Sequence, residues 1–464
     1  MIMKFKKLMA LLMATAMTVG LIGCGAKESS GETETAKVTQ EQTETQAEET
    51  TGEDEEAQPA ESDLTGVEIS FMNSKGEVQE AIEAMAAAFE DETGIVVEVI
   101  ACGVGESPYT QITSAYNAGN APTLAMLDIT DVVSLANEYA VDLSGEDWVS
   151  ECKDQATMVD GTVYGFPFCI EGRGIIYNKT TIEDTLGKEF DPKSINSYDA
   201  LKSLLEELRA AGMENPVVLS KEDWSLGNHM LGTIYDTYDG TTAGSTEVIQ
   251  QLKAGELSVA AYERFEQFMD TFDLLKEYNI NGADPLGALY DQDPIFMADG
   301  EAALWPNGCW AWANLAEAGA STEDEYGFIS LVFGNDTSDF ANNGIEAAAT
   351  KAIMIDKVQA SEEQIEAAKE FLDWMVYSEN GQKMLVQDAG VIPACANNGF
   401  EALDPLAKDI QARMKEGRTY SSAFIAPGDH WSVLGASMQK YLGDQCGREE
   451  LAADIDAYWK ALAE

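Results

Sequence analysis

Residues 160–179 read DGTVYGFPFCIEGRGIIYNK, and this stretch decides how the chain is organised. Aromatic and β-branched residues on both sides of it are typical of strands. Between them, the insert Glu171-Gly172-Arg173-Gly174 places a carboxylate next to a guanidinium. A buried pair of strands would remove both charges from water at a high cost. We therefore predict two strands joined by a polar crossover, with Glu171 facing a cleft rather than a core.

Length and charge narrow the class of protein. The 464 residues are enough for two domains with sizeable cores, and the hydrophobic fraction is an ordinary 45%. The net charge of −54 comes from 82 acidic and 28 basic residues. Such a chain repels phosphate backbones, so we expect no nucleic-acid partner. The acidity fits the well-solvated surface of an exported protein.

The N-terminus has the pattern of an exported, lipid-anchored chain. A basic start is followed by an apolar stretch that is short for a membrane span, and the motif Leu21-Ile22-Gly23-Cys24 ends it. This motif resembles the lipobox of bacterial lipoproteins, which implies a signal peptide over residues 1–23 and acylation of Cys24. Two acyl chains hold a membrane stably. The alternative is an ordinary signal peptide with a chance cysteine.

A polar, acidic segment follows Cys24. Glu, Thr, Gln and Ala dominate residues 24–63, so the segment lacks the apolar residues that a core needs. We expect a disordered tether between the lipid and the folded part.

Strands and helices alternate along the next part of the chain. Short apolar or β-branched runs predict strands at 67–72, 95–101 and 123–127, and apolar spacing predicts helices at 77–93 and 109–118. This order indicates an α/β fold with parallel strands. The later part continues with a strand and further helices, predicted as a strand at 302–305 and helices at 198–211, 262–278, 293–300, 362–377 and 451–463.

Motifs for catalysis, metal binding and cofactor binding are absent from the sequence. With only His229 and His430, no HExxH helix can form, and neither a G-x-S-x-G elbow nor a Walker A loop occurs. The cysteines show no metal-ligand spacing. We therefore expect no metal and no cofactor. The six cysteines after Cys24 leave both disulfides and free thiols open, and two distant carboxylates of a glycosidase stay open as well.

Several tryptophans stand beside polar and turn residues. Three of them crowd LWPNGCWAW (304–312), one lies in KEDWSLGNHM (221–230) and one in APGDHWSV (426–433). Each side chain has two interpretations, core packing or a flat face that lines a cleft. Sugars suit the second interpretation, because they combine an apolar C–H face with a rim of hydroxyls.

Three stretches together resemble a known family. They are DGTVYGFPFCIEGRGIIYNK (160–179), FMADGEAALWPNGCWAWANL (296–315) and AAKEFLDWMVYSENGQKMLVQDAGVIPA (367–394). In this order, behind a lipobox, they are similar to extracellular solute-binding proteins (family 1) of carbohydrate ABC transporters, above all to the maltodextrin-binding type. The resemblance implies a two-lobed, type II periplasmic-binding-protein-like α/β fold with a ligand cleft between lobes that hinge crossovers join.

The same resemblance implies lobe boundaries and the polar part of a ligand site. The first lobe is expected at 64–170 plus 342–392, and the second at 171–341 plus 393–464. The resemblance implies that four polar residues contact the ligand. They are Lys75 in the loop after the first strand, Asp128 and Asp131 after the third strand, and Glu171 on the first crossover.

Stacking aromatics of the second lobe are implied at Trp224, Trp310 and Trp431. This chain departs from the maltodextrin type in the first lobe, where the usual Pro-Asp is Pro122-Thr123 and an aromatic residue is replaced by Leu127. One stacking platform is therefore lost.

Glu171 is expected to accept hydrogen bonds from sugar hydroxyls with both carboxylate oxygens. Gly172 and Gly174 are expected to let the crossover bend and to leave space for a ligand. The structural alternative is a Glu171–Arg173 ion pair that stiffens the hinge.

The predicted function is binding without catalysis. We expect a monomer that is lipid-anchored at the extracellular face of the cell membrane and delivers a mono- or oligosaccharide to the permease subunits of an ABC importer. One alternative is a binding protein for an amino acid, a peptide or a polyamine, and another is a surface-anchored glycan hydrolase.

Cys24→Ser tests the predicted anchor. The serine cannot be acylated through sulfur, so we expect the variant to leave the membrane fraction when cells are fractionated. Metabolic labelling with a fatty acid should mark the wild type alone. Fatty-acid label on the Cys24→Ser variant would show that another residue is acylated and would contradict the predicted anchor.

Overall fold

The computed structural model describes residues 64–103, 107–152, 155–420 and 424–463. The predicted signal peptide (1–23) and the predicted acylated tether (24–63) lie outside these residues. Within the ranges given, no helix is long and apolar enough to cross a membrane.

Nine strands form a curled sheet with the path β2-β1-β3-β8-β5-β4, to which β6 and β7 add on β5 and β9 adds on β8. The pairs β1–β2 and β1–β3 are parallel, as predicted, whereas β3–β8 and β5–β8 are antiparallel. The strands are β1 (Glu68–Asn73), β2 (Val96–Ala101), β3 (Leu124–Asp128), β4 (Thr157–Val159), β5 (Thr162–Asn178), β6 (Leu304–Gly308), β7 (Tyr326–Ile329), β8 (Ile345–Ile355) and β9 (Thr419–Tyr420).

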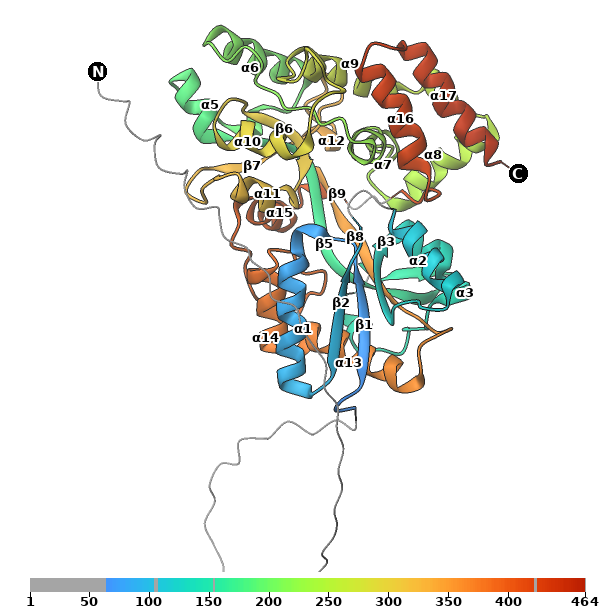
Figure 1. Cartoon of the computed structure of the whole chain (residues 1–464). Coiled ribbons are helices and arrows are strands. Elements are labelled where there is room, and N and C mark those ends of the chain that lie inside the picture. The colour runs from blue at the N-terminus through green and yellow to red at the C-terminus, as the bar shows by residue number, and fades with distance from the viewer. Residues whose placement is uncertain (1–63, 104–106, 153–154, 421–423, 464) are drawn as a thin grey trace, which may run out of the picture. The chain divides into compact units, whose positions relative to one another are not determined.

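The first lobe, at the bottom of Figure 1, packs helices against β1, β2 and β3. On α1, Ile82, Met85 and Phe89 share one buried face, as their spacing predicts. Gly94 ends this helix with φ +76°, a conformation that glycine adopts without strain. The helices are α1 (Gln79–Thr93), α2 (Pro108–Ala118), α3 (Ile129–Tyr139), α4 (Trp148–Cys152), α13 (Glu362–Tyr377) and α14 (Glu379–Lys383), with the short η1 (Gly76–Val78) and η7 (Met384–Asp388).

The second lobe is mostly helical and has its own core, in which Phe265, Phe272 and Trp459 are fully buried. The predicted helices at 198–211, 262–278 and 451–463 are all present here, within three residues of their predicted ends. Its helices are α5 (Lys179–Leu186), α6 (Tyr198–Ala210), η4 (Ser225–Met230), α7 (Thr233–Asp236), α8 (Thr242–Ala254), α9 (Glu263–Glu277), α10 (Asp293–Ala298), α11 (Ala311–Glu317), α12 (Phe340–Asn343), α15 (Pro405–Lys415), α16 (His430–Leu442) and α17 (Arg448–Ala461), with the short η3 (Pro192–Ser194), η5 (Val259–Ala261) and η6 (Tyr290–Gln292).

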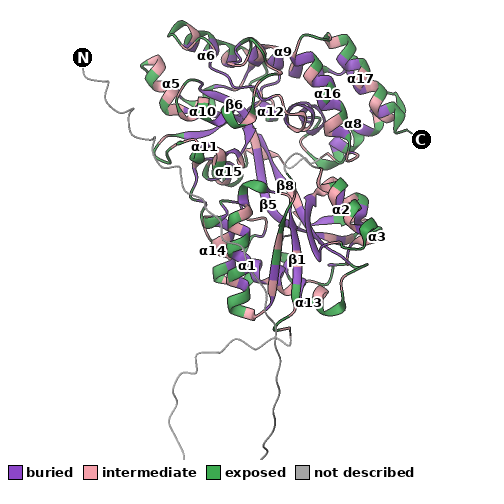
Figure 2. Cartoon of the chain, in the orientation of Figure 1, coloured by how far each residue is buried: buried purple, intermediate pink, exposed green. Residues whose placement is uncertain are grey.

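Two long strands, β5 and β8, run from one lobe into the other (Figure 1). Most of their residues are buried (Figure 2). The prediction of two separate strands around residues 171–174 is therefore wrong, because β5 continues without interruption from Thr162 to Asn178. The polar insert lies in its middle, paired with β8.

Strand β5 can continue through the polar insert because acidic side chains pair with the guanidinium of Arg173. Arg173 forms ion pairs with Asp236 of α7 at 2.6 Å and with Glu346 of β8 at 2.5 Å. Burial raises the pKa of Glu346, the Arg173 guanidinium opposes this shift, and Asp236 adds like charge. The structural alternative, an ion pair between Glu171 and Arg173, is not formed.

The two glycines of the insert are needed for packing. A Cβ at position 172 would lie 2.5 Å from Cδ1 of Ile410, and one at position 174 would lie 2.8 Å from the carbonyl oxygen of Ile329. The expectation that Gly172 and Gly174 leave space for a ligand is wrong, because protein atoms of α15 and β7 fill that space.

The structure contains one disulfide among the described cysteines, which the sequence alone left open. Cys152, at the end of α4, is bonded to Cys395, and the two are 243 positions apart in sequence. Four other cysteines of the described residues lie outside this bond, namely Cys102, Cys169, Cys309 and Cys446.

Removing this disulfide with the double change Cys152→Ser and Cys395→Ser should destabilise the protein. The cross-link closes a long loop and restricts the unfolded chain, so we expect a loss of about 2–5 kcal/mol in the free energy of unfolding. Denaturant titration measures it, with Cys446→Ser as the control that removes a free thiol. Equal unfolding midpoints for the double variant and the wild type would contradict the bond.

Candidate functional site

Charged side chains gather where strands of the first lobe end. Lys75 follows β1 and Asp128 ends β3, and the carboxyl ends of parallel strands meet at the same edge of a sheet. Asp128 pairs with Lys351 of β8 at 2.7 Å across the β3–β8 ladder. This edge faces the second lobe, so it supplies a charged floor for anything bound between the lobes.

Glu171 lies in this floor and is only 8% exposed. Its Oε1 accepts a hydrogen bond from Nζ of Lys75, and its Oε2 accepts one from the hydroxyl of Thr350 on β8. Burial opposes ionisation, but the Lys75 ammonium and the two hydrogen bonds outweigh it and lower the pKa of Glu171 to about 2. Lys75 also contacts Glu77 at 2.8 Å. Both predicted residues, Lys75 and Glu171, are therefore in one network.

A cavity of about 280 Å³ opens beside this network, and we call it the interlobe cavity. Three of the seven predicted ligand contacts, Lys75, Glu171 and Trp310, line it. Its other lining residues come from both lobes and are Glu77, Val78, Cys169, Ile170, Cys309, Trp312, Ala313, Thr322, Gln387, Asp388, Ala389, Gly390, Val391, Leu403 and Asp404.

Trp310 forms an aromatic wall of the cavity and belongs to a group of packed rings. Trp224, just before η4, packs edge-to-face on His229 and on Tyr290, with ring centroids 5.3 Å apart in both pairs. The ring centroid of Trp310 lies 4.6 Å from that of His229. The structure thus brings Trp224 and Trp310 together through His229. Gly308 makes room for the ring of Trp310 itself, since a Cβ there would lie 2.1 Å from it.

His229 was not among the predicted site residues. It follows Trp224 in the same stretch of sequence and contacts the rings of both Trp224 and Trp310. The sequence alone does not show these contacts. Burial and the nearby Arg173 guanidinium lower its pKa to about 3, so the imidazole is neutral at physiological pH.

Asp131 and Trp431 lie away from the interlobe cavity. Burial and the neighbouring Asp128 raise the pKa of Asp131 to about 7. A Cβ on Gly428, in the loop before α16, would lie 3.2 Å from Oδ1 of Asp131, so this loop of the second lobe reaches the first lobe here. Trp431 is in the first turn of α16, which packs on η4 through Gly227. The cavity is not lined by Asp128, Asp131, Trp224 or Trp431.

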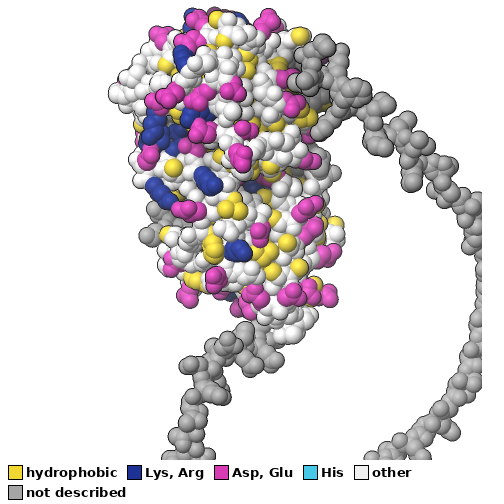
Figure 3. Space-filling model, turned by 90° about the vertical axis from the view of Figure 1, so that its left-hand side faces the viewer, with side chains coloured by type: hydrophobic (Ala, Val, Ile, Leu, Met, Phe, Trp, Pro, Cys, Tyr) yellow, Lys and Arg dark blue, Asp and Glu magenta, His cyan; other side chains and the backbone are white. Residues whose placement is uncertain are grey.

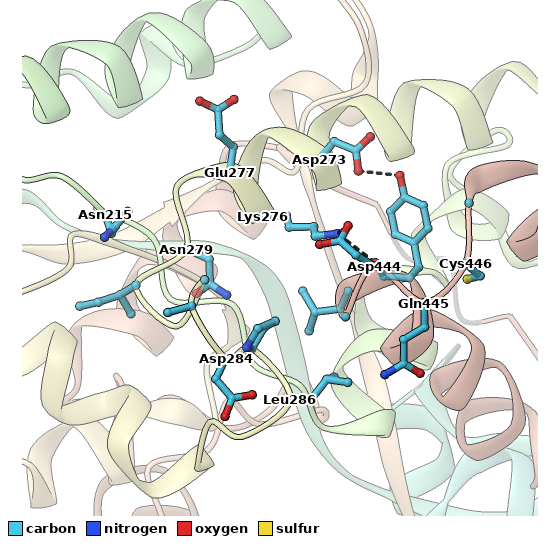
Figure 4. A pocket seen from close by; sticks show the side chains of 18 of the residues that line it. Asn215, Asp273, Lys276, Glu277, Asn279, Asp284, Leu286, Asp444, Gln445 and Cys446 are labelled. Atoms are coloured by element: carbon cyan, nitrogen blue, oxygen red, sulfur yellow. Dashed lines mark hydrogen bonds and ion pairs between the residues drawn. The ribbon is translucent and has the colours of Figure 1, made fainter.

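A second cavity, of about 1060 Å³, lies within the second lobe between α9, the 279–286 loop and the α16–α17 turn. None of the predicted site residues lines it. Figure 4 shows Lys276 paired with Asp444, at 2.6 Å, and Asp273 accepting a hydrogen bond from Tyr441, at 2.7 Å. Because this cavity lies within one lobe and none of the predicted site residues lines it, we place the candidate site in the interlobe cavity instead.

The interlobe cavity has the groups that bind a polar solute and not those that bind a metal ion. Within the described part of the chain, no group of three or more His, Cys, Asp or Glu side chains is arranged to hold a metal. The floor offers carboxylate acceptors and an ammonium donor, and the wall offers flat apolar rings. Such a combination recognises a ligand with both hydroxyls and an apolar face.

Residues 84–413 match the family of bacterial extracellular solute-binding proteins. A multiple sugar-binding protein from Streptococcus mutans is 22% identical over 363 residues, which are 74% of this chain and 79% of that protein. A maltooligosaccharide ABC transporter solute-binding lipoprotein from Streptococcus pneumoniae is 25% identical over 335 residues, or 68% of this chain and 69% of that protein. The solved structure of the solute-binding protein RafE in complex with raffinose has a TM-score of 0.68 at 20% identity, covering 86% of this chain and 100% of that one.

The chain therefore belongs to the bacterial extracellular solute-binding proteins. Its fold is the two-lobed, type II periplasmic-binding-protein-like α/β fold, as predicted.

Glu171→Gln should weaken both the fold and the binding of a solute. The amide keeps the shape but removes the more buried of the two carboxylates that contact Lys75, so we expect a loss of about 1.5–3 kcal/mol in unfolding free energy at pH 7. Glu171 has a depressed pKa, so its share of the stability is present above its unfolded pKa and is lost as pH falls toward 2. The difference between variant and wild type should therefore shrink from pH 6 to pH 3.

Chemical denaturation at several pH values measures this difference. Glu77→Gln is the matched control, because Glu77 contacts the same ammonium but is more exposed, and it should cost less. A pH-independent difference for Glu171→Gln would mean that the Lys75–Glu171 charge pair does not stabilise the fold.

Proposed function

We propose that this protein captures a carbohydrate between its two lobes and delivers it to the membrane permease of an ABC importer. The observation that carries the proposal is the interlobe cavity, in which a hydrogen-bonded Lys75–Glu171 floor faces the Trp310 wall. Sugar hydroxyls pair with the charged groups, and the sugar's C–H face stacks on the indole ring. Relatives named for binding multiple sugars, maltooligosaccharide and raffinose support this ligand class.

We assign residues 64–170 with 342–392 to the first lobe and 171–341 with 393–464 to the second. The separate cores support this division, since one contains Phe71 and Phe371 and the other contains Phe265 and Trp459. A third cluster joins residues on both sides of the boundary, among them Ile170 and Ile176. Closure of the lobes about β5 and β8 would then enclose the ligand, and the permease would recognise the closed form.

We further propose that the mature protein is a monomer attached through acylated Cys24 to the outer face of the cell membrane. The lipobox-like motif before Cys24 supports the attachment, as does the relative named as a lipoprotein. The acidic residues 25–63 would keep the binding lobes in solvent above the membrane surface.

Binding without catalysis fits the site better than hydrolysis. A glycosidase uses a pair of carboxylates that flank the bond to be cleaved. Among the carboxylates that line the cavity, Glu171 does not fit either role in this arrangement, because Lys75 and Thr350 engage both of its oxygens. Incubation with a glycan panel should therefore leave every glycan intact, and release of shorter products would favour the hydrolase. We favour a sugar over an amino acid, peptide or polyamine because of the named relatives.

Trp310→Ala tests the stacking wall. Loss of this partly buried aromatic side chain from the cavity wall should weaken sugar binding by about 1–3 kcal/mol, measured by calorimetry with sugars that the wild type binds. Tyr377→Ala, which removes an exposed aromatic side chain on α13, is the control and should bind like the wild type. Unchanged affinity of a folded Trp310→Ala variant would make Trp310 a packing residue and would remove the main support for a sugar in this cavity.

A further inference from the structure

The interlobe cavity has an excess of negative charge. Four carboxylates line it, whereas Lys75 is its one cationic lining residue. Glu171 and Glu77 share that ammonium. Asp388 and Asp404 form no ion pair with any residue that the structure describes. Acidic side chains are also spread over the face of the protein shown in Figure 3, while Lys and Arg form a few separate groups there.

Asp404 is a buried carboxylate of the cavity wall, and one of its two oxygens has no hydrogen-bond partner among the described residues. It is 6% exposed and begins α15, where its Oδ1 accepts a hydrogen bond from the backbone nitrogen of Ala407 at 2.8 Å. Its Oδ2 is buried and has no hydrogen-bond partner among the described residues. Burial raises the pKa of Asp404 to about 6, so the carboxyl is mostly ionised at pH 7. An unpaired buried carboxylate oxygen is costly, and a donor from a ligand would remove this cost.

Asp404 and Gly390 both line the interlobe cavity. A Cβ on Gly390 would lie 4.0 Å from Oδ2, so this oxygen lies close to a part of the cavity wall that carries no side chain. Trp310 and Trp312 line the same cavity. Their rings attract cations as well as sugar C–H faces, since the face of an indole is electron-rich.

We propose that the interlobe cavity selects a carbohydrate that carries a protonated amine, and that Oδ2 of Asp404 binds the ammonium group. The inference rests on the proposed function and specifies the class of sugar. A neutral sugar offers hydroxyl donors but leaves the excess negative charge of the cavity uncompensated. An ammonium group supplies both a charge and donors, and charge-assisted hydrogen bonds are the stronger kind. An N-acetylated amine has no charge, so an N-acetylated sugar should bind with the affinity of a neutral sugar.

Calorimetry on the purified full-length chain tests the preference. The panel has matched members of one series, namely glucose, N-acetylglucosamine and glucosamine with their β-1,4-linked disaccharides, together with galactose, galactosamine, maltotriose and raffinose. We expect an amino sugar to bind at least tenfold more tightly than its hydroxyl and N-acetyl counterparts at pH 7. Tightest binding of a neutral sugar would overturn the inference and leave the proposed function intact. Binding of no sugar in the panel would count against the proposed function itself.

The variant Asp404→Asn tests the residue. Asparagine caps a helix as well as aspartate does, so α15 should be retained while the charge is lost. We expect the preference for the amino sugar over its neutral counterpart to fall at least tenfold. Asp191→Asn is the matched control, because Asp191 caps η3 in the same way but does not line the cavity. A retained preference in a folded Asp404→Asn variant would show that another group binds the ammonium.

Discussion

The structure depends on an antiparallel pair of strands that holds ionised side chains in its buried middle. β5 and β8 connect the lobes, and three central residues of β5, Cys169, Ile170 and Glu171, also line the interlobe cavity. Glu171 and Arg173 can stay there only because each meets an opposite charge, Lys75 in one case and Asp236 with Glu346 in the other. A buried ion pair contributes little net stability when complete, but loss of one partner is costly. Only a small set of side chains can therefore occupy these positions of the hinge.

The two charges have different roles in the hinge. Lys75 comes from the loop after β1, so its bond to Glu171 ties the first lobe to the crossover strand. Arg173 instead binds α7 and β8, on the side of the second lobe. Two residues of one strand thus anchor opposite lobes. A movement of the lobes that bends this strand between residues 171 and 173 would keep both ion pairs.

Local sequence predicted the regular parts of the fold well. The apolar spacing of α1 and the glycine after it gave the helix and its end, because both depend on neighbouring residues. The continuous course of β5 could not be predicted, because the partners of Arg173 lie 63 and 173 positions away and those of Glu171 lie 96 and 179 positions away. For the same reason Lys75 and Glu171 are each predicted as site residues from the sequence, but their mutual bond is not. His229, Asp404 and Trp312 carry no local signal that separates them from core or surface residues.

The disulfide has a consequence for a protein exposed to proteases. Cys152 and Cys395 enclose a loop with a sequence separation of 243, which contains β5, β8 and most helices of the second lobe. A single cut in any surface turn within that loop would leave the two fragments covalently joined. The nicked molecule would keep both lobes on one covalent scaffold, so backbone damage there would not by itself release half of the binding site.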